Sequence, residues 1–446
     1  MKQFNVYVTA KDSGERLKQY KLQNFIADKE KNSINSVKMD TRKKYQKILG
    51  FGGALTEASA YALSKINENE QRKVLESYYH KENGIGYNFA RVHINSCDFS
   101  LENYSYVEDG DMTLGTFTLD RDEKYVLPLV RTVKEMTSNN LNILASPWSP
   151  PSYMKTNGEM NNGGKLREDC KQLWADYFVK YINKMKEKGI DIWAVTVQNE
   201  PAAHQVWDSC LYTAEEERDF VKDYLGPTMH KNGLDDKKII IWDHNRDIVY
   251  ERAKAVLEDK EAAKYVWGTG IHWYMSEEFS NTSKIHDEFP DKHIVFTEGC
   301  QEGGVKLGSW DTGERYGRNI IGDLNNYIEA WMDWNIALDE TGGPNHVNNL
   351  CDAPIIIDSK TKEVHYNSSF FYIAHFSKFI KNAVRINSSV MGDKIYAVGC
   401  LNEDNTLCAV IMNEENEDKY INLQIDDESL LIKLKAHSIY TIVEEK

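Results

Sequence analysis

The chain has 446 residues, of which 41% are hydrophobic and 11% aromatic, enough for one barrel-sized domain and a smaller second domain. Its net charge of −15 argues against nucleic acids and anionic membrane surfaces as partners. No apolar run reaches the length of a signal peptide or a membrane span, and the seven widely spaced cysteines indicate reduced thiols. We therefore expect a cytoplasmic protein and leave its oligomeric state open.

The first predicted element is a half-buried strand at residues 4–9, where apolar and polar side chains alternate. Residues 10–46 are highly charged and show no clear periodicity. From about residue 47 a strand, a loop and a helix follow one another repeatedly. The strand candidates end at Gly50, His93, Ser146, Glu200, His244, Trp273, Glu298 and Ala337.

Several of the intervening helices show an apolar side chain at every third or fourth position. One covers residues 173–185, with Gly189 as its stop signal. Another begins at Thr213, whose spacing from Glu216 is that of a capping box. A third apolar face runs from Ile320 to Trp331 and predicts a helix over that range.

Strand–helix units repeated over roughly 330 residues predict an α/β fold, a (β/α)8 barrel. An open doubly wound sheet is the alternative, but Gly50-Phe51-Gly52-Gly53 lacks the glycine spacing of that fold's first crossover. After about residue 380, short alternating runs between turn-rich stretches predict a small antiparallel β-sandwich, which the N-terminal strand joins. We expect residues 1–40 and 381–446 to form the sandwich and residues 41–380 the barrel.

Two of the strand candidates deliver a glutamate at their ends, in Asn199-Glu200-Pro201 and in Thr297-Glu298. A barrel collects the C-terminal ends of its strands on one face, so both carboxyl groups would meet in one site. Two carboxyl groups are the minimum equipment for cleaving a glycosidic bond. A single glutamate at a strand end is more often a solvated surface residue, so the interpretation depends on the pair. The histidines show no metal-ligand spacing, and we expect neither a metal nor a cofactor.

The order of the motifs along nearly the whole chain resembles glycoside hydrolase family 30, in the branch that includes glucosylceramidase. The motifs that carry the resemblance are Gly50–Thr56, Ser96–Ser100, Ala145–Pro151, Asn199–Pro201, His272–Tyr274, Thr297–Glu298, Asp333–Asn335 and Gly342–Asn345. The resemblance implies a retaining β-glycosidase on a (β/α)8 barrel with a side β-sandwich. It makes Glu200 the acid/base and Glu298 the nucleophile.

The resemblance also implies a set of residues around the sugar. Those that hold the non-reducing sugar are Asp98, Trp148, Asn199 and Trp334, and those of the surrounding polar shell are Arg91, His272, Tyr274 and Asn349. Taken without the motifs, the two tryptophans would be core aromatics and His272 a hydrogen-bonded structural histidine. In a site, an ionised nucleophile needs nearby hydrogen-bond donors, and the tryptophans offer flat faces to a pyranose ring.

Two departures from the family pattern lie on the leaving-group side. His346 stands where the glucosylceramidase branch tends to have a tryptophan, and residues 202–210 resemble bacterial members. We expect an exo-acting enzyme on small or oligosaccharide β-glucosides, with β-xylosidase or β-1,6-glucanase specificity as alternatives on the same mechanism. The alternative outside enzymes is a carbohydrate-binding protein on a degenerate barrel, which predicts a missing carboxylate. Linkage and aglycone stay open.

Overall fold

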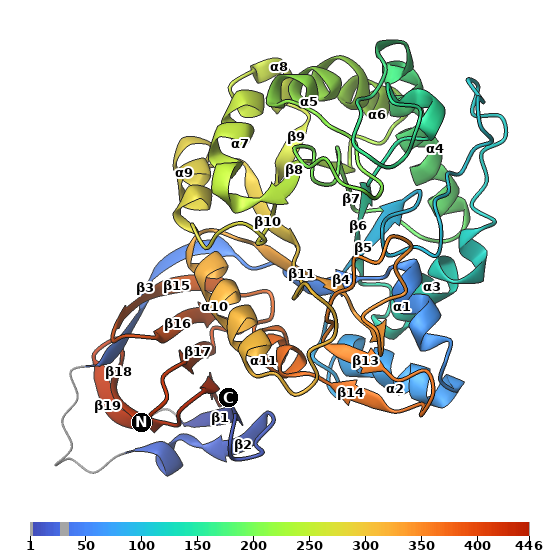
Figure 1. Cartoon of the computed structure of the whole chain (residues 1–446). Coiled ribbons are helices and arrows are strands. Elements are labelled where there is room, and N and C mark those ends of the chain that lie inside the picture. Colours follow the sequence, from blue (N-terminus) through green and yellow to red (C-terminus); the bar gives the residue numbers. More distant parts are fainter. Residues whose placement is uncertain (1–2, 27–34, 446) are drawn as a thin grey trace.

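The computed structural model describes residues 3–26 and 35–445, and its centre is a closed barrel of eight parallel strands (Figure 1). The strands follow one another around the barrel in chain order, with β11 pairing to β4 to close it. They are β4 (Gly50–Ala54), β5 (Phe89–Ile94), β6 (Asn142–Pro147), β7 (Ala194–Thr196), β8 (Lys238–Asn245), β9 (Val266–His272), β10 (His293–Glu298) and β11 (Ala330–Asn335). The predicted (β/α)8 barrel is confirmed, and the doubly wound sheet is excluded.

Strand β10 ends at the predicted residue, and β5, β6 and β8 each run one residue further than predicted, while the other four strands differ in other ways. The first barrel strand begins at Gly50, because the charged residues before it belong to a long strand of the other domain. Strand β9 stops at His272, one residue before the predicted end. Strand β11 ends at Asn335 and not at Ala337. Strand β7 ends at Thr196, so Glu200 lies beyond it in a turn.

Helices cover the outside of the barrel strands (Figure 1). Their bounds are α1 (Glu57–Leu63), α2 (Glu68–Tyr79), α3 (Val126–Met136), α4 (Lys171–Glu187), α5 (Ala214–Phe220), α6 (Gly226–Lys231), α7 (Val249–Leu257), α8 (Lys260–Ala263), α9 (Ser280–Glu288), α10 (Asp311–Asn325) and α11 (Ser368–Ser377). The capping box of Thr213 and Glu216 is present at the start of α5. The helix predicted to reach Trp331 ends at Asn325, because Tyr327 has φ +71° and Trp331 lies in β11.

The second domain is a nine-stranded sheet of the sandwich type, built from both ends of the chain (Figure 1). Its order is β19-β18-β3-β15-β16-β17-β20-β1-β2, and a bridge between Ile26 and Ile432 brings its two ends together. Its strands are β1 (Phe4–Ala10), β2 (Lys18–Lys21), β3 (Ser36–Lys47), β15 (Val384–Met391), β16 (Ile395–Leu401), β17 (Leu407–Asn413), β18 (Lys419–Ile425), β19 (Glu428–Leu434) and β20 (Ser438–Glu444). Strand β3 crosses the expected boundary between residues 40 and 41.

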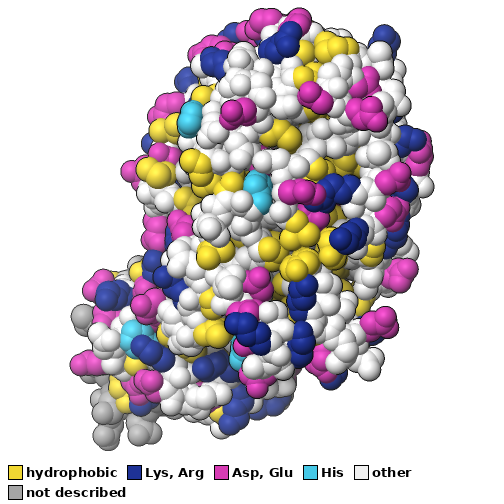
Figure 2. Space-filling view, turned by 45° about the vertical axis from the view of Figure 1, so that its right-hand side comes forward, with side chains coloured by type: hydrophobic (Ala, Val, Ile, Leu, Met, Phe, Trp, Pro, Cys, Tyr) yellow, Lys and Arg dark blue, Asp and Glu magenta, His cyan; other side chains and the backbone are white. Residues whose placement is uncertain are grey.

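The two domains join through α10 and α11. His375 of α11 hydrogen-bonds Thr441 of β20 and Thr9 of β1 with both ring nitrogens, at 2.8 Å each. Figure 2 shows acidic and basic side chains intermixed over both domains on the face drawn. Within the described residues, no helix combines the length and the apolar character that a membrane crossing requires.

A small three-stranded sheet completes the fold beside the barrel. It consists of β12 (Leu338–Asp339), β13 (Ile355–Ile357) and β14 (Val364–Tyr366). The loop between β12 and β13 carries the Gly-Gly-Pro-Asn motif, and it returns to the C-terminal end of the barrel, where Asn345 and Asn349 contact Asp98.

Candidate active site

A cavity of about 250 Å³ opens at the C-terminal ends of the barrel strands. Eight of the ten residues predicted for the site line it: Asp98, Trp148, Asn199, Glu200, Tyr274, Glu298, Trp334 and Asn349. The other two, Arg91 and His272, are fully buried directly beneath and hydrogen-bond the two glutamates. The tertiary structure therefore brings all ten predicted residues together.

The local backbone conformation positions the two glutamates. Glu200 has φ +49°, a left-handed conformation that is rare for a residue with a side chain and typical of functional sites. Its N–H donates to the carbonyl of Asp243 at 3.0 Å, which fixes the turn after β7 to the end of β8. Glu298 ends β10, where the pairing register with β9 shifts between Phe296 and Glu298.

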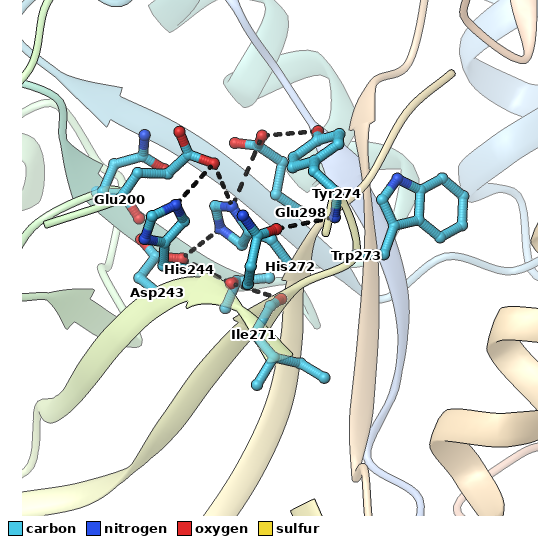
Figure 3. Close-up of polar contacts among 12 residues, drawn as sticks. Glu200, Asp243, His244, Ile271, His272, Trp273, Tyr274 and Glu298 are labelled. Carbon is cyan, nitrogen blue, oxygen red and sulfur yellow. Dashed lines mark hydrogen bonds and ion pairs between the residues drawn. The ribbon is translucent and has the colours of Figure 1, made fainter. Parts of the chain in front are cut away.

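The two carboxyl groups lie close together with one imidazole between them (Figure 3). One oxygen of Glu200, one oxygen of Glu298 and a ring nitrogen of His272 all lie within 4.8 Å of one another. The Nδ1 atom of His272 is 3.1 Å from Oε1 of Glu200 and 3.9 Å from Oε1 of Glu298. Such a group of three could in principle bind a cation.

The donors around Glu298 argue against a metal at that position. Arg91 donates through Nη1 to Oε2 of Glu298, and the hydroxyl of Tyr274 donates to Oε1 at 2.8 Å. Burial alone would lower the pKa of His272, but the charge of Glu298 and hydrogen bonds to Asp243 and Glu200 raise it to about 9. A protonated imidazole has no lone pair for a metal, and a guanidinium already neutralises the carboxylate. The absence of a metal stays a prediction.

Arg91 connects both halves of the site from below. Its Nη2 donates to Oδ1 of Asn199 at 2.9 Å and to Oδ2 of Asp243 at 2.8 Å. Its guanidinium also lies over the ring of Trp148, with 4.7 Å between the guanidinium carbon and the ring centroid. A planar fork of donors suits this arrangement, because one charge is shared between two buried carboxylates without losing hydrogen-bond geometry.

The titration of the two glutamates is set by different neighbours. Burial would raise the pKa of Glu200, but the neighbouring His244 and His272 bring it below its ordinary value. Burial raises the pKa of Glu298 and the charge of Glu200 raises it further, while His272 and Arg91 oppose the rise. The carboxyl groups are close enough to titrate as one pair.

One end of the pocket places a carboxylate and two amides beside aromatic faces. Oδ2 of Asp98 accepts from the amides of Asn345 at 3.1 Å and Asn349 at 3.0 Å, and burial raises the pKa of Asp98 to about 7. Trp148 and Trp334 are stacked with their ring centroids 5.2 Å apart. Flat apolar rings beside a carboxylate and amides are the groups that bind a pyranose ring.

Several residues of the site were not predicted. Asp243 accepts from Arg91, His272 and Thr297, and these partners hold its pKa well below the usual range although burial alone would raise it. His244 lines the pocket beside Glu200. The others that line it or bind its residues are Asn345, Gln205 and Trp207. Asp243 and His244 lie at the end of a strand candidate, Asn345 lies inside a motif, and Gln205 and Trp207 lie in the loop after Glu200; these positions were the available signal.

Comparison with known proteins agrees with this geometry. The sequence profile of the glycosyl hydrolase family 30 TIM-barrel domain matches residues 48–380, and that of the family 30 beta sandwich domain matches residues 382–442. The lysosomal acid glucosylceramidase of Mus musculus is 37% identical over 424 residues, which cover 90% of this chain and 82% of that protein.

Two solved structures share the whole architecture. SrfJ from Salmonella typhimurium is 31% identical with a TM-score of 0.94, and the match covers 100% of both chains. The endo-β1,6-glucanase BT3312 is 28% identical with a TM-score of 0.87, and the match covers 99% of this chain and 100% of that one. The barrel, the sandwich, the paired glutamates and these matches agree, and the chain belongs to glycoside hydrolase family 30.

Proposed function

We propose that this glycoside hydrolase is a retaining exo-β-glycosidase that acts on β-glucosides through a glycosyl–Glu298 intermediate. The observation that carries the proposal is the separation of the two carboxyl groups, an oxygen of each lying within 4.8 Å of the other. Retaining enzymes hold their carboxyl groups about 5–5.5 Å apart, whereas inverting enzymes leave room for a water at about 6.5–9.5 Å.

In the first step, Glu298 attacks the anomeric carbon and forms an ester while the glycosidic C–O bond breaks. Glu200 passes a proton to the leaving oxygen. Because the pKa of Glu200 lies below its ordinary value, this proton comes from His272, which is protonated and lies 3.1 Å from Glu200. In the second step, Glu200 takes a proton from water, and the resulting hydroxide displaces Glu298. Arg91 and Tyr274 keep the nucleophile oriented in both steps.

The charge of Glu298 connects the two steps. This charge is the largest effect that raises the pKa of His272. When Glu298 becomes an ester its charge is lost, and with it the repulsion between the two carboxylates, so Glu200 is better able to stay ionised as a base. The alternation of Glu200 between acid and base follows from this coupling.

The closed end of the pocket supports exo action. Asp98 is 3% exposed and its Oδ2 accepts from two amides, and we propose that a sugar bound there does not continue beyond it. The leaving-group side carries Trp207 and the exposed Met275, which is 68% accessible.

We also propose a cytoplasmic location, which the seven unpaired cysteines support.

The test uses aryl β-glucoside, β-xyloside and β-fucoside with wild type, Glu200→Gln and Glu298→Gln. We expect both variants to lose at least about 10³-fold in kcat. Azide should restore activity to Glu200→Ala with a β-configured product. Glu217→Gln, a buried glutamate bonded to the Trp242 amide outside the pocket, is the matched control and should keep its activity. An α-configured product of wild type, or full activity in Glu298→Gln, contradicts the mechanism.

A second candidate, endo-β-1,6-glucanase activity, is favoured by the likeness to the solved endo-β1,6-glucanase at 28% identity. Product analysis on a β-1,6-glucan separates the two functions. Release of glucose alone from the chain end supports exo action, whereas early release of mixed oligosaccharides supports endo action. Faster cleavage of the aryl β-xyloside than of the β-glucoside would support β-xylosidase specificity.

A further inference from the structure

Two loops of the active site are joined by a buried ion pair outside the sugar pocket. Nε2 of His346, in the loop after β12, lies 3.2 Å from Oδ2 of Asp208, in the loop after β7. The side chain of His346 is 9% exposed and that of Asp208 is fully buried. The other oxygen of Asp208 accepts from Ser96 and from Asn103, so Oδ2 is the oxygen left for the imidazole.

The same loop that carries His346 also holds Asp98. The backbone N–H of His346 donates to the carbonyl of Asp98 at 3.1 Å. Asn345 and Asn349, on either side of His346, donate their amides to Oδ2 of Asp98 at 3.1 and 3.0 Å. Any movement of His346 is therefore transmitted to Asp98 through three hydrogen bonds.

The charges around this pair require a cation. His346 faces Asp208 and Asp98, and Asp98 also faces Glu298 across the pocket. Burial would lower the pKa of His346, but its contacts with Asp208 and its proximity to Asp98 raise it. With a neutral imidazole, Asp208 and Asp98 would repel one another at low dielectric, and the cation left near Asp208 would be Lys155, whose ammonium already donates to the carbonyls of Met160 and Ser209.

We propose that the imidazolium of His346, bound to Asp208, is a positioning residue that keeps Asp98 ionised and in register to accept sugar hydroxyls. This inference rests on the proposed function, and it adds that affinity for the sugar depends on His346 whereas the chemistry at Glu200 and Glu298 does not. Within the described part of the chain, the residues that line the cavity do not include His346.

The experiment compares wild type with His346→Gln, which keeps a hydrogen-bond donor but not the charge. On an aryl β-glucoside at a pH above about 7, where Asp98 of wild type is ionised, we expect KM to rise about tenfold and kcat to change less than twofold. The pH at which affinity is half lost on the acid side should move upward, because Asp98 becomes harder to ionise. His365→Gln, another histidine paired with a carboxylate at 3.7 Å and remote from the pocket, is the matched control.

The double variant Asp208→Asn/His346→Gln removes both charges of the pair and guards against misfolding of the single variant. We expect it to fold with KM still raised, because the contact between the two loops is lost. Its acid-side pH dependence should return toward that of wild type, because Asp208, whose charge raises the pKa of Asp98, is removed together with the imidazolium. A wild-type KM and pH profile in either variant overturns the inference, as does a fall in kcat with KM unchanged. If wild type cleaves none of the glycosides the proposed function fails, whereas an active wild type with an unaffected His346→Gln removes only this inference.

Discussion

Replacing Arg91 by lysine tests whether one buried guanidinium organises the active site. Arg91 is fully buried and makes four hydrogen bonds, to Ser146, Glu298, Asn199 and Asp243. Lysine keeps the positive charge but replaces the planar fork by a single ammonium group. The variant therefore removes geometry while leaving the buried carboxylates with a counter-charge.

The expected loss can be worked from these contacts. A lysine ammonium placed between the carboxylates cannot reproduce all four bonds, and we expect at least two to be lost. Hydrogen bonds to charged groups contribute about 1.5–3 kcal/mol each. If about 3 kcal/mol of this is lost from the transition state, kcat/KM falls by roughly 10²-fold. The lysine ammonium would still be paired with Asp243 and Glu298, so the protein should still fold.

The assay is kcat/KM on an aryl β-glucoside, together with the free energy of unfolding from urea titration. Arg246→Lys is the matched control, because Arg246 is equally buried and binds both oxygens of Asp323 at 2.9 and 3.0 Å without lining the pocket. We expect Arg246→Lys to lose stability and to keep its activity per folded molecule.

If Arg91→Lys keeps kcat/KM within about twofold of wild type, a fork of donors is unnecessary at this position. If both variants lose activity equally and in proportion to their loss of stability, the effect of Arg91 is on folding and not on the orientation of Glu298.

Three further predictions concern titration and local stability. Burial lowers the pKa of His375 to about 3, so between that value and about 6.5 the unfolded chain binds a proton that the folded chain does not. The free energy of unfolding should therefore fall as the pH drops through this range. In urea titrations, the stability of His375→Gln should depend less on acid pH than that of wild type. NMR of labelled histidines should find His272 still protonated at pH 8, with its pKa moving toward about 6.5 in Glu298→Gln; a neutral His272 at pH 8 in wild type would contradict the network. Thr213→Ala removes the capping box with Glu216 and should lower stability by about 1 kcal/mol, whereas Thr213→Ser should be near neutral; equal losses would rule out the cap as the cause.

Local pattern determined the elements of the barrel and the residues at their ends. Apolar runs of strand length are buried in the parallel sheet, which is why β5, β6, β8 and β10 could be located from sequence. The capping residue Thr213 could likewise be placed, because its hydrogen bond spans only three residues. Glu200 and Glu298 followed, because parallel barrels place strand ends on one face.

Where elements end depended on contacts that the local pattern does not contain. The apolar face from Ile320 onward suits a helix as far as Trp331, but the chain leaves the helix at Asn325 so that Trp331 can stack on Phe296 inside the barrel wall, with ring centroids 4.3 Å apart. Glu200 lies four residues beyond β7 for a similar reason, because its amide bonds the end of β8.

The sequence by itself therefore determined the family, the barrel and the two glutamates that the barrel brings together, because these depend on short-range periodicity and on motifs. Only the tertiary structure decided that Asp243 and Arg91 neutralise each other beneath Glu298, and that His346 is paired with Asp208. Such pairs join residues far apart in the chain, and closure of the barrel sets their distance. The charge states that govern this site arise from that closure and from burial.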